Sequence, residues 1–178
     1  MIGLKYVEKI REYCDYIEEH LNNVEWAWKV LQDRCSDMEF IWNEFRYLAL
    51  DGEILCHDIS KFSKEEFIPY CMKFYPPDLS EFSSIIAIED TFPEAWLHHQ
   101  LYNPHHWENW TKGDMIKTPY DKEMHCIHMI IDWMAMSKKF NNNPRDYYER
   151  NKDKMNLPDW ANELCLEVFY RIDDLFGK

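Results

Sequence analysis

The stretch IREYCDYIEEHLNNVEWAWKVL, residues 10–31, decides which class of fold this sequence can adopt. Its apolar residues recur every three or four positions, at Ile10, Cys14, Ile17, Leu21, Val24, Trp28 and Leu31. An amphipathic α-helix presents one face to a core with this spacing. The pattern therefore predicts one long helix over about the first thirty residues.

The same periodicity continues in the next third of the chain. A second helix is predicted from about Met38 to Cys56, with an irregularity at Gly52 because glycine weakens a helix. Ser63 and Glu66 have the form of a capping box, which predicts that a short helix starts there and continues to Phe74. Two prolines, at 76 and 77, then end that helix.

Helical patterns also fill the rest of the sequence. One is expected from residues 78–80 through Ile86 towards His99, divided at Pro93, and another over residues 120–140, ended by NNNP at 141–144. A last helix is predicted over residues 157–176. No segment alternates as a strand does, so we expect an all-α fold, a helical bundle forming a single domain over residues 1–178.

The composition of the chain disfavours several classes of function. The 33 acidic and 20 basic residues give a formal net charge of −13, which disfavours binding to long nucleic acids or to an anionic membrane surface. The first residues lack the apolar stretch of a signal peptide, and we expect a cytoplasmic protein. The six cysteines form no CxxC pair, and the four glycines form no phosphate-binding loop.

Two buried polar residues are expected on the helices. His20 lies within the apolar stripe of the first helix, so its side chain should point inward and needs a partner, either a backbone carbonyl or a metal ion. Asp132 lies within MIIDWMAM, where an ionised carboxylate is costly unless it is paired or bound to a cation. His125 and His128 precede it on roughly the same face and could act as ligands or as hydrogen-bond donors to ligands.

Further histidines gather in two places. His57 and Asp58 end the second predicted helix, where both could reach one ion, although for this dipeptide taken alone a capping aspartate beside a surface histidine is the preferred interpretation. The stretch WLHHQLYNPHHWENW, residues 96–110, carries two histidine pairs separated by a turn. Imidazole and carboxylate together suit divalent first-row metals.

The order of these motifs resembles the HD-domain superfamily, all-α metal-dependent hydrolases named for their His-Asp pair. HDISKF, HHQLYNPHHWENW and DWMAMS are most similar to a branch found in phage and bacterial genomes. The resemblance covers about residues 15–140 and implies the ligands His20, His57, Asp58 and Asp132. In members with two ions it adds His99 and one or both of His105 and His106, with Asp58 bridging the ions. His98 does not fit this pattern.

The resemblance implies hydrolysis of a phosphate ester with one or two divalent ions, of manganese, iron, cobalt or zinc, with magnesium as a further option. The expected substrate is a nucleotide or another small phosphorylated molecule. Lys61 could contact its phosphate, and Glu108 could orient a ligand histidine or relay a proton. A solvated lysine is the competing interpretation for Lys61.

Two alternatives stay open at this point. The same superfamily includes di-iron oxygenases with a comparable ligand set, so the ligands alone do not choose between the two reactions. The second alternative is a phage-encoded protein that keeps the fold but binds a host protein and has no catalytic activity. Neither the oligomeric state nor the inward member of each histidine pair follows from the sequence.

Overall fold

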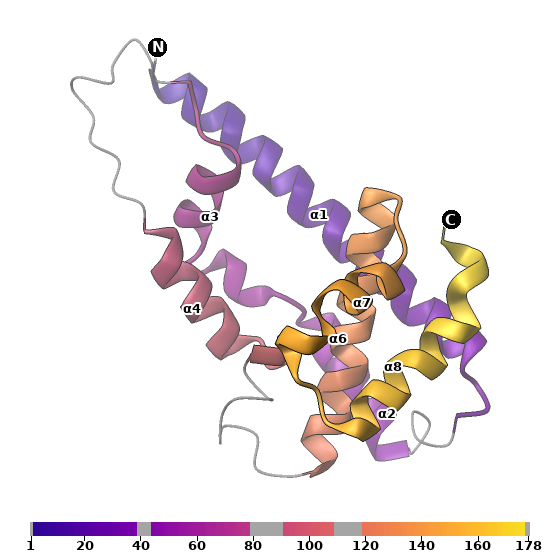
Figure 1. Cartoon of the computed structure of the whole chain (residues 1–178). Helices are drawn as coiled ribbons and strands as arrows, with labels where there is room; N and C mark the ends of the chain where they lie inside the picture. Colours follow the sequence, from indigo (N-terminus) through magenta and orange to yellow (C-terminus); the bar gives the residue numbers. More distant parts are fainter. Residues whose placement is uncertain (1, 39–43, 79–90, 109–118, 177–178) are drawn as a thin grey trace. The chain divides into compact units, whose positions relative to one another are not determined.

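The structure, a computed structural model, describes residues 2–38, 44–78, 91–108 and 119–176 (Figure 1). Every regular element among these residues is a helix, which confirms the all-α prediction. The α-helices are α1 (Ile2–Arg34), α2 (Glu44–Leu55), α3 (Phe67–Phe74), α4 (Phe92–Tyr102), α6 (Pro119–Phe140), α7 (Pro144–Met155) and α8 (Asp159–Ile172). Two short 3-10 helices are η1 (Ile59–Phe62) and η3 (Asp173–Leu175).

The chain divides into two compact units, each built from two segments. Unit 1 consists of Met1–Glu19 and Asp58–Asn103, and unit 2 of His20–His57 and Pro104–Lys178. The boundary falls within α1 and again between the adjacent residues His57 and Asp58. The single domain over residues 1–178 stays a prediction.

Helix α6 runs through the core of unit 2 and packs against α2, α7 and α8 (Figure 1). Its residues Ile130, Ile131 and Met134 are fully buried, as are Leu31 of α1 and Phe169 of α8. Burying one such side chain stabilises a fold by about 1.5–3 kcal/mol relative to leaving it in water. The apolar run around Asp132 is therefore the main contribution of α6 to this core.

Unit 1 packs α3 against α4 and places η1 beside both helices. Aromatic rings connect its two segments: the Tyr13 ring lies 5.3 Å from that of Phe67 and 5.9 Å from that of Tyr75, measured between ring centroids. Such tilted arrangements satisfy the ring quadrupoles and add to the free energy gained by burial. They connect the part of α1 around Tyr13 to α3.

Two local predictions were wrong. Helix α2 continues through Gly52 to Leu55 without an irregularity, because the helix tolerates the small loss of propensity at one glycine. Ser63 and Glu66 form no capping box: α3 begins at Phe67, and the Glu66 side chain makes no capping hydrogen bond. Its carboxylate binds two histidines instead.

Helix α7 is not predicted from the sequence, in which NNNP at 141–144 indicates only the end of the preceding helix. Asn143 is the N-cap of α7, accepting a hydrogen bond from the Arg145 backbone N–H at 2.9 Å, and Pro144 occupies the first helical turn. Both residues are typical of a helix start. The last predicted helix is present, shorter than expected, as α8.

Pro93 lies in the first turn of α4, which begins at Phe92. The predicted division at Pro93 also depends on residues 79–90, which lie outside the described ranges. The helix expected from residue 78 through Ile86 falls largely on residues 79–90, outside the described ranges. None of the described helices is both long enough and apolar enough to cross a membrane.

Candidate metal centre

Three predicted ligands converge in unit 2. His20 Nε2 lies 3.0 Å from His57 Nε2, and Asp132 Oδ1 lies 3.3 Å from the first and 3.7 Å from the second. His20 comes from α1, Asp132 from α6, and His57 follows the end of α2. Both histidines are buried, at 2% and 4% exposure, so the inward orientation predicted for His20 is confirmed.

These distances suit the ligands of one small ion. Ligand atoms about 2.0–2.2 Å from a first-row metal stand roughly 2.8–3.6 Å from one another in octahedral or tetrahedral geometry. The observed separations of 3.0 and 3.3 Å lie within that range, and that of 3.7 Å lies just beyond it. Two imidazole nitrogens and one carboxylate oxygen are also a donor set that first-row divalent metals accept. The residues present therefore fit a metal ion.

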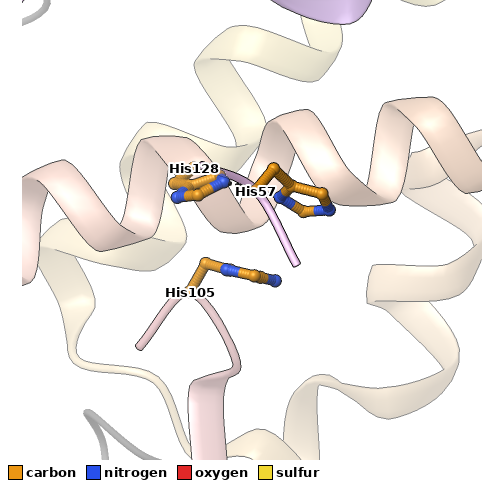
Figure 2. A group of neighbouring side chains, drawn as sticks. All are labelled: His57, His105 and His128. Atoms are coloured by element: carbon orange, nitrogen blue, oxygen red, sulfur yellow. Dashed lines mark hydrogen bonds between the residues drawn. The ribbon is translucent and has the colours of Figure 1, made fainter. Parts of the chain in front are cut away.

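His105 and His128 extend this cluster. Figure 2 shows the rings of His57, His105 and His128 gathered beside α6, and one nitrogen of each lies within 4.8 Å of the others. The His57 and His105 rings stack at a centroid distance of 4.6 Å, and His105 lies 4.3 Å from the His128 ring. All three side chains are buried, so this group could hold a metal ion.

His128 also hydrogen-bonds the far side of the His57 ring. Its Nε2 lies 2.8 Å from His57 Nδ1, while His57 Nε2 faces His20 and Asp132. A histidine that binds a metal through one ring nitrogen usually donates its other N–H to a partner that fixes its orientation. His128 can accept that hydrogen bond from His57.

The two members of the second histidine pair differ in burial. His105 is 2% exposed, whereas His106 is only half-buried, with its ring 4.5 Å from that of His105. His105 is thus the member that joins His57 and His128.

Glu108 is half-buried too. Desolvation, followed by the negative charges of Glu108 and Asp132, raises the pKa of Tyr147, so both carboxylates lie near that ring.

Unit 1 contains a second cluster of predicted residues, around Asp58. Its backbone is left-handed, with φ 54°, a conformation that aspartate tolerates better than most residues. Its side chain caps no helix. Instead, Asp58 Oδ2 accepts a hydrogen bond from Lys61 Nζ at 2.5 Å, and Oδ1 lies 3.3 Å from His99 Nε2. The capping interpretation of Asp58 was therefore wrong.

Lys61 is not the solvated lysine that one interpretation described. It is 6% exposed, and its ammonium group lies 5.8 Å from the centre of the Tyr70 ring as well as beside Asp58. A buried ammonium is tolerated when it is paired with a carboxylate. The pair places one positive and one negative charge in the interior of unit 1.

Glu66 is the acid that sequence interpretation missed. It is fully buried, and its two carboxylate oxygens lie 2.6 Å from His98 Nδ1 and 2.7 Å from His99 Nδ1. Burial alone would raise the pKa of Glu66, but hydrogen bonds from His99 and His98 outweigh it and lower the pKa. Glu66 is therefore a buried carboxylate anion.

The charges of this second cluster act on two buried tyrosines of unit 1, Tyr13 and Tyr70. The Tyr70 ring lies 5.5 Å from the His99 ring, and Tyr13 lies elsewhere in the same unit. Desolvation, together with the nearby charges of Asp58 and Glu66, raises the pKa of both phenols well above the ordinary value. These hydroxyls stay protonated over the physiological pH range and can act as hydrogen-bond donors.

The structure thus brings the predicted residues together in two sets, each within one unit. In unit 2 these are the buried His20, His57 and His105 and the half-buried Asp132, His106 and Glu108, and in unit 1 they are Asp58, Lys61 and His99. The sequence predicts only a capping role for Glu66, and it predicts nothing for Asn103 beyond its place between the two histidine pairs. Both are fully or nearly fully buried, at 0% and 5% exposure, and no sequence pattern signalled this.

These elements define an all-helical protein whose buried histidine and aspartate side chains could hold a metal ion. The chain belongs to DUF5662, a family of unknown function, which it matches over residues 9–170. No curated protein and no solved structure gives a significant match.

Proposed function

We propose that this protein is a metal-dependent phosphohydrolase, of the kind that its resemblance to the HD-domain superfamily implies. The observation that carries the proposal is the cluster of His20, His57 and Asp132 in unit 2, with ligand atoms 3.0–3.7 Å apart. Two buried imidazoles beside a carboxylate whose side chain is 15% exposed form a donor set that suits a cation.

The ion would be held by His20, His57 and Asp132, with His105 as a further ligand. Nitrogen-rich ligand sets favour manganese, iron, cobalt or zinc over magnesium, which prefers oxygen ligands. When bound, a divalent ion lowers the pKa of a water molecule and neutralises charge that builds up on phosphoryl oxygens. His128 Nε2 hydrogen-bonds the Nδ1 atom of His57 and so fixes the orientation of that ring. The half-buried carboxylate of Glu108 would orient a ligand histidine.

Unit 1 contains its own set of polar residues, which could hold an ion and a phosphate group within that unit. The facing atoms of Asp58 and His99, 3.3 Å apart, are a pair of donors for such an ion. Lys61, buried beside Asp58, supplies positive charge for a phosphate group. The net charge of −13 favours a small phosphorylated substrate, such as a nucleotide, over a polynucleotide.

Quantitative metal analysis tests the first step. Protein purified without added metal is compared with His57→Ala and with Asp153→Asn, an exposed carboxylate on α7 that serves as control. We expect near-stoichiometric first-row metal in the wild type and in the control, and its loss in His57→Ala. If the wild type takes up no metal even after reconstitution, the histidines are structural and a non-enzymatic binding protein becomes the better hypothesis.

A screen of phosphate esters tests the reaction itself. Release of inorganic phosphate that depends on the metal, and that is equal with and without oxygen, supports the hydrolase. A reaction that requires both iron and oxygen would instead identify a di-iron oxygenase. Lys61→Ala should weaken phosphate-ester turnover, whereas Lys64→Ala, which removes a lysine whose side chain is 90% exposed, should not.

A further inference from the structure

We propose that Glu66 is a positioning residue that holds His98 and His99 in one tautomer and thereby aims His99 Nε2 at Asp58. The inference deepens the proposed function, on which the role of His99 as a metal ligand rests. The orientation itself can be measured without any metal.

The geometry of the carboxylate carries the proposal. Its Oε1 atom lies 2.6 Å from His98 Nδ1, and its Oε2 atom lies 2.7 Å from His99 Nδ1. A carboxylate can only accept hydrogen bonds, so each contact requires a hydrogen on Nδ1 of the histidine. Glu66 is fully buried and His99 is 1% exposed, so water cannot easily replace either bond.

Asn103 and Ser60 support the same assignment. Asn103 Nδ2 has two hydrogens, and its two shortest contacts are to Ser60 Oγ at 2.7 Å and to the His99 carbonyl at 2.8 Å. Both hydrogens are therefore used, and the longer approach of Nδ2 to His99 Nδ1, at 3.1 Å, needs no hydrogen bond. Ser60, which accepts from Asn103, donates to Glu66. The His99 Nδ1–H is thus directed to Glu66.

The consequence falls on the other side of the His99 ring. A neutral imidazole with its hydrogen on Nδ1 has a lone pair on Nε2, and that atom lies 3.3 Å from Asp58 Oδ1. Two electron-rich atoms facing one another attract a cation. Carboxylate–histidine–metal arrangements of this kind raise the basicity of the ligand, and removing the carboxylate typically weakens metal binding by about 10–100-fold.

His98 uses the second oxygen of Glu66 and makes the proposal testable. Its side chain is 22% exposed, and its ring stacks on Tyr102 at a centroid distance of 4.3 Å. In Glu66→Gln one acceptor oxygen becomes an NH₂ donor, so the two Nδ1–H groups can no longer both be satisfied. One of the two rings must then move its hydrogen to Nε2.

We expect His99 to be the ring that changes. The Ser60 hydroxyl lies 3.4 Å from His99 Nδ1 and, no longer held by a carboxylate, can donate to that nitrogen. Removing the competing histidine should reverse the effect, because in the double variant Glu66→Gln/His98→Ala the amide oxygen of residue 66 can turn to His99. A merely structural role for Glu66 predicts no such reversal.

The experiment is nitrogen-15 NMR of the histidine rings in metal-free, full-length protein containing a chelator. We expect Nδ1–H on His98 and His99 in the wild type and in Glu65→Gln, a control that changes a partly exposed neighbour by the same atoms. We expect Nε2–H on His99 in Glu66→Gln and Nδ1–H on His99 again in the double variant. Manganese titrations of the same four proteins should show affinity about 10–100-fold lower in Glu66→Gln, and part of that loss should be recovered in the double variant.

Two results would overturn the positioning role: a wild-type His99 without hydrogen on Nδ1, or ring signals that are the same in Glu66→Gln and in the wild type. A third result separates the two proposals. If the tautomers behave as expected but neither the wild type nor any variant binds manganese, the positioning role is supported and the proposed function fails. Circular dichroism shows whether each variant is folded, and Glu66→Asp replaces Glu66→Gln if the latter is not. With its shorter carboxylate it should keep Nδ1–H on at most one ring.

Discussion

His20 Nε2 and His57 Nε2 lie 3.0 Å apart, although the two residues are separated by 37 positions in the sequence. Two buried imidazole nitrogens at this distance either share one hydrogen or face a common cation. Asp132 Oδ1 lies 3.3 Å from the His20 nitrogen, which adds negative charge at the same point. His20 lies in α1, His57 directly after α2, and Asp132 in α6. The cluster therefore connects three helical segments of unit 2.

Asp132→Asn should weaken metal binding by at least about tenfold, because the amide keeps the shape of the side chain but removes its charge. Titration calorimetry with manganese or zinc measures the change. Asp153→Asn, the exposed control on α7, should bind as the wild type does. Equal affinity of Asp132→Asn and wild type would exclude Asp132 as a ligand.

Lys61→Ala should lower the free energy of unfolding by about 3–5 kcal/mol, since it leaves the buried Asp58 carboxylate without its ammonium partner. Lys64→Ala provides the matched control three residues later, at a side chain that is 90% exposed, and should change stability by less than about 0.5 kcal/mol. Urea denaturation followed by circular dichroism measures both. A loss below about 1 kcal/mol for Lys61→Ala would mean that the pair contributes little.

Phe169→Ala and Tyr170→Ala should differ sharply although they are neighbours on α8. Phe169 is fully buried, with its ring 5.6 Å from that of Tyr148, and its truncation should cost about 3–5 kcal/mol. Tyr170 is 80% exposed, and its truncation should cost no more than about 0.5 kcal/mol. Urea denaturation again distinguishes them, and similar losses would contradict the orientation of α8.

Asn143→Ala should destabilise the protein by about 0.5–2 kcal/mol, because it removes the side-chain acceptor for the Arg145 backbone N–H at the start of α7. Asn142→Ala changes the preceding, exposed residue in the same way and should have a smaller effect. Thermal unfolding of both variants tests the assignment. If the two melt together, Asn143 does not cap the helix.

Cys35 should make stability fall at high pH. Burial, as the main cause, raises the pKa of its thiol from 9.0 to about 11. The native state therefore holds this proton more tightly than the unfolded chain, so its contribution is complete below pH 9 and is lost as pH rises through about 11. Unfolding free energies measured at pH 8.5 and 10.5 should decline more steeply in wild type than in Cys35→Ala. Cys14→Ala, at an exposed cysteine, should follow the wild type.

The helical class was decided by the sequence alone, because a side-chain period of about 3.6 is a local property that survives without knowledge of neighbours. The stripe of α1 put His20 inward, and the apolar run around Asp132 indicated a carboxylate in need of a partner; both expectations match the burial of His20 and the contacts of Asp132. Helix ends were less predictable. Asn143 and Pro144 carried the start signal of α7, but it was interpreted only as a stop.

Only the tertiary structure decided which polar groups meet. Ser63 and Glu66 had the correct local spacing for a capping box, yet the buried carboxylate gains more from two imidazole N–H groups, 32 and 33 positions away, than from one backbone N–H. His105 is buried and the adjacent His106 is only half-buried, because consecutive side chains at a turn point in different directions. The contact between His57 and His128 spans 71 positions. Contacts between residues so far apart depend on how the helices pack, which local periodicity does not encode.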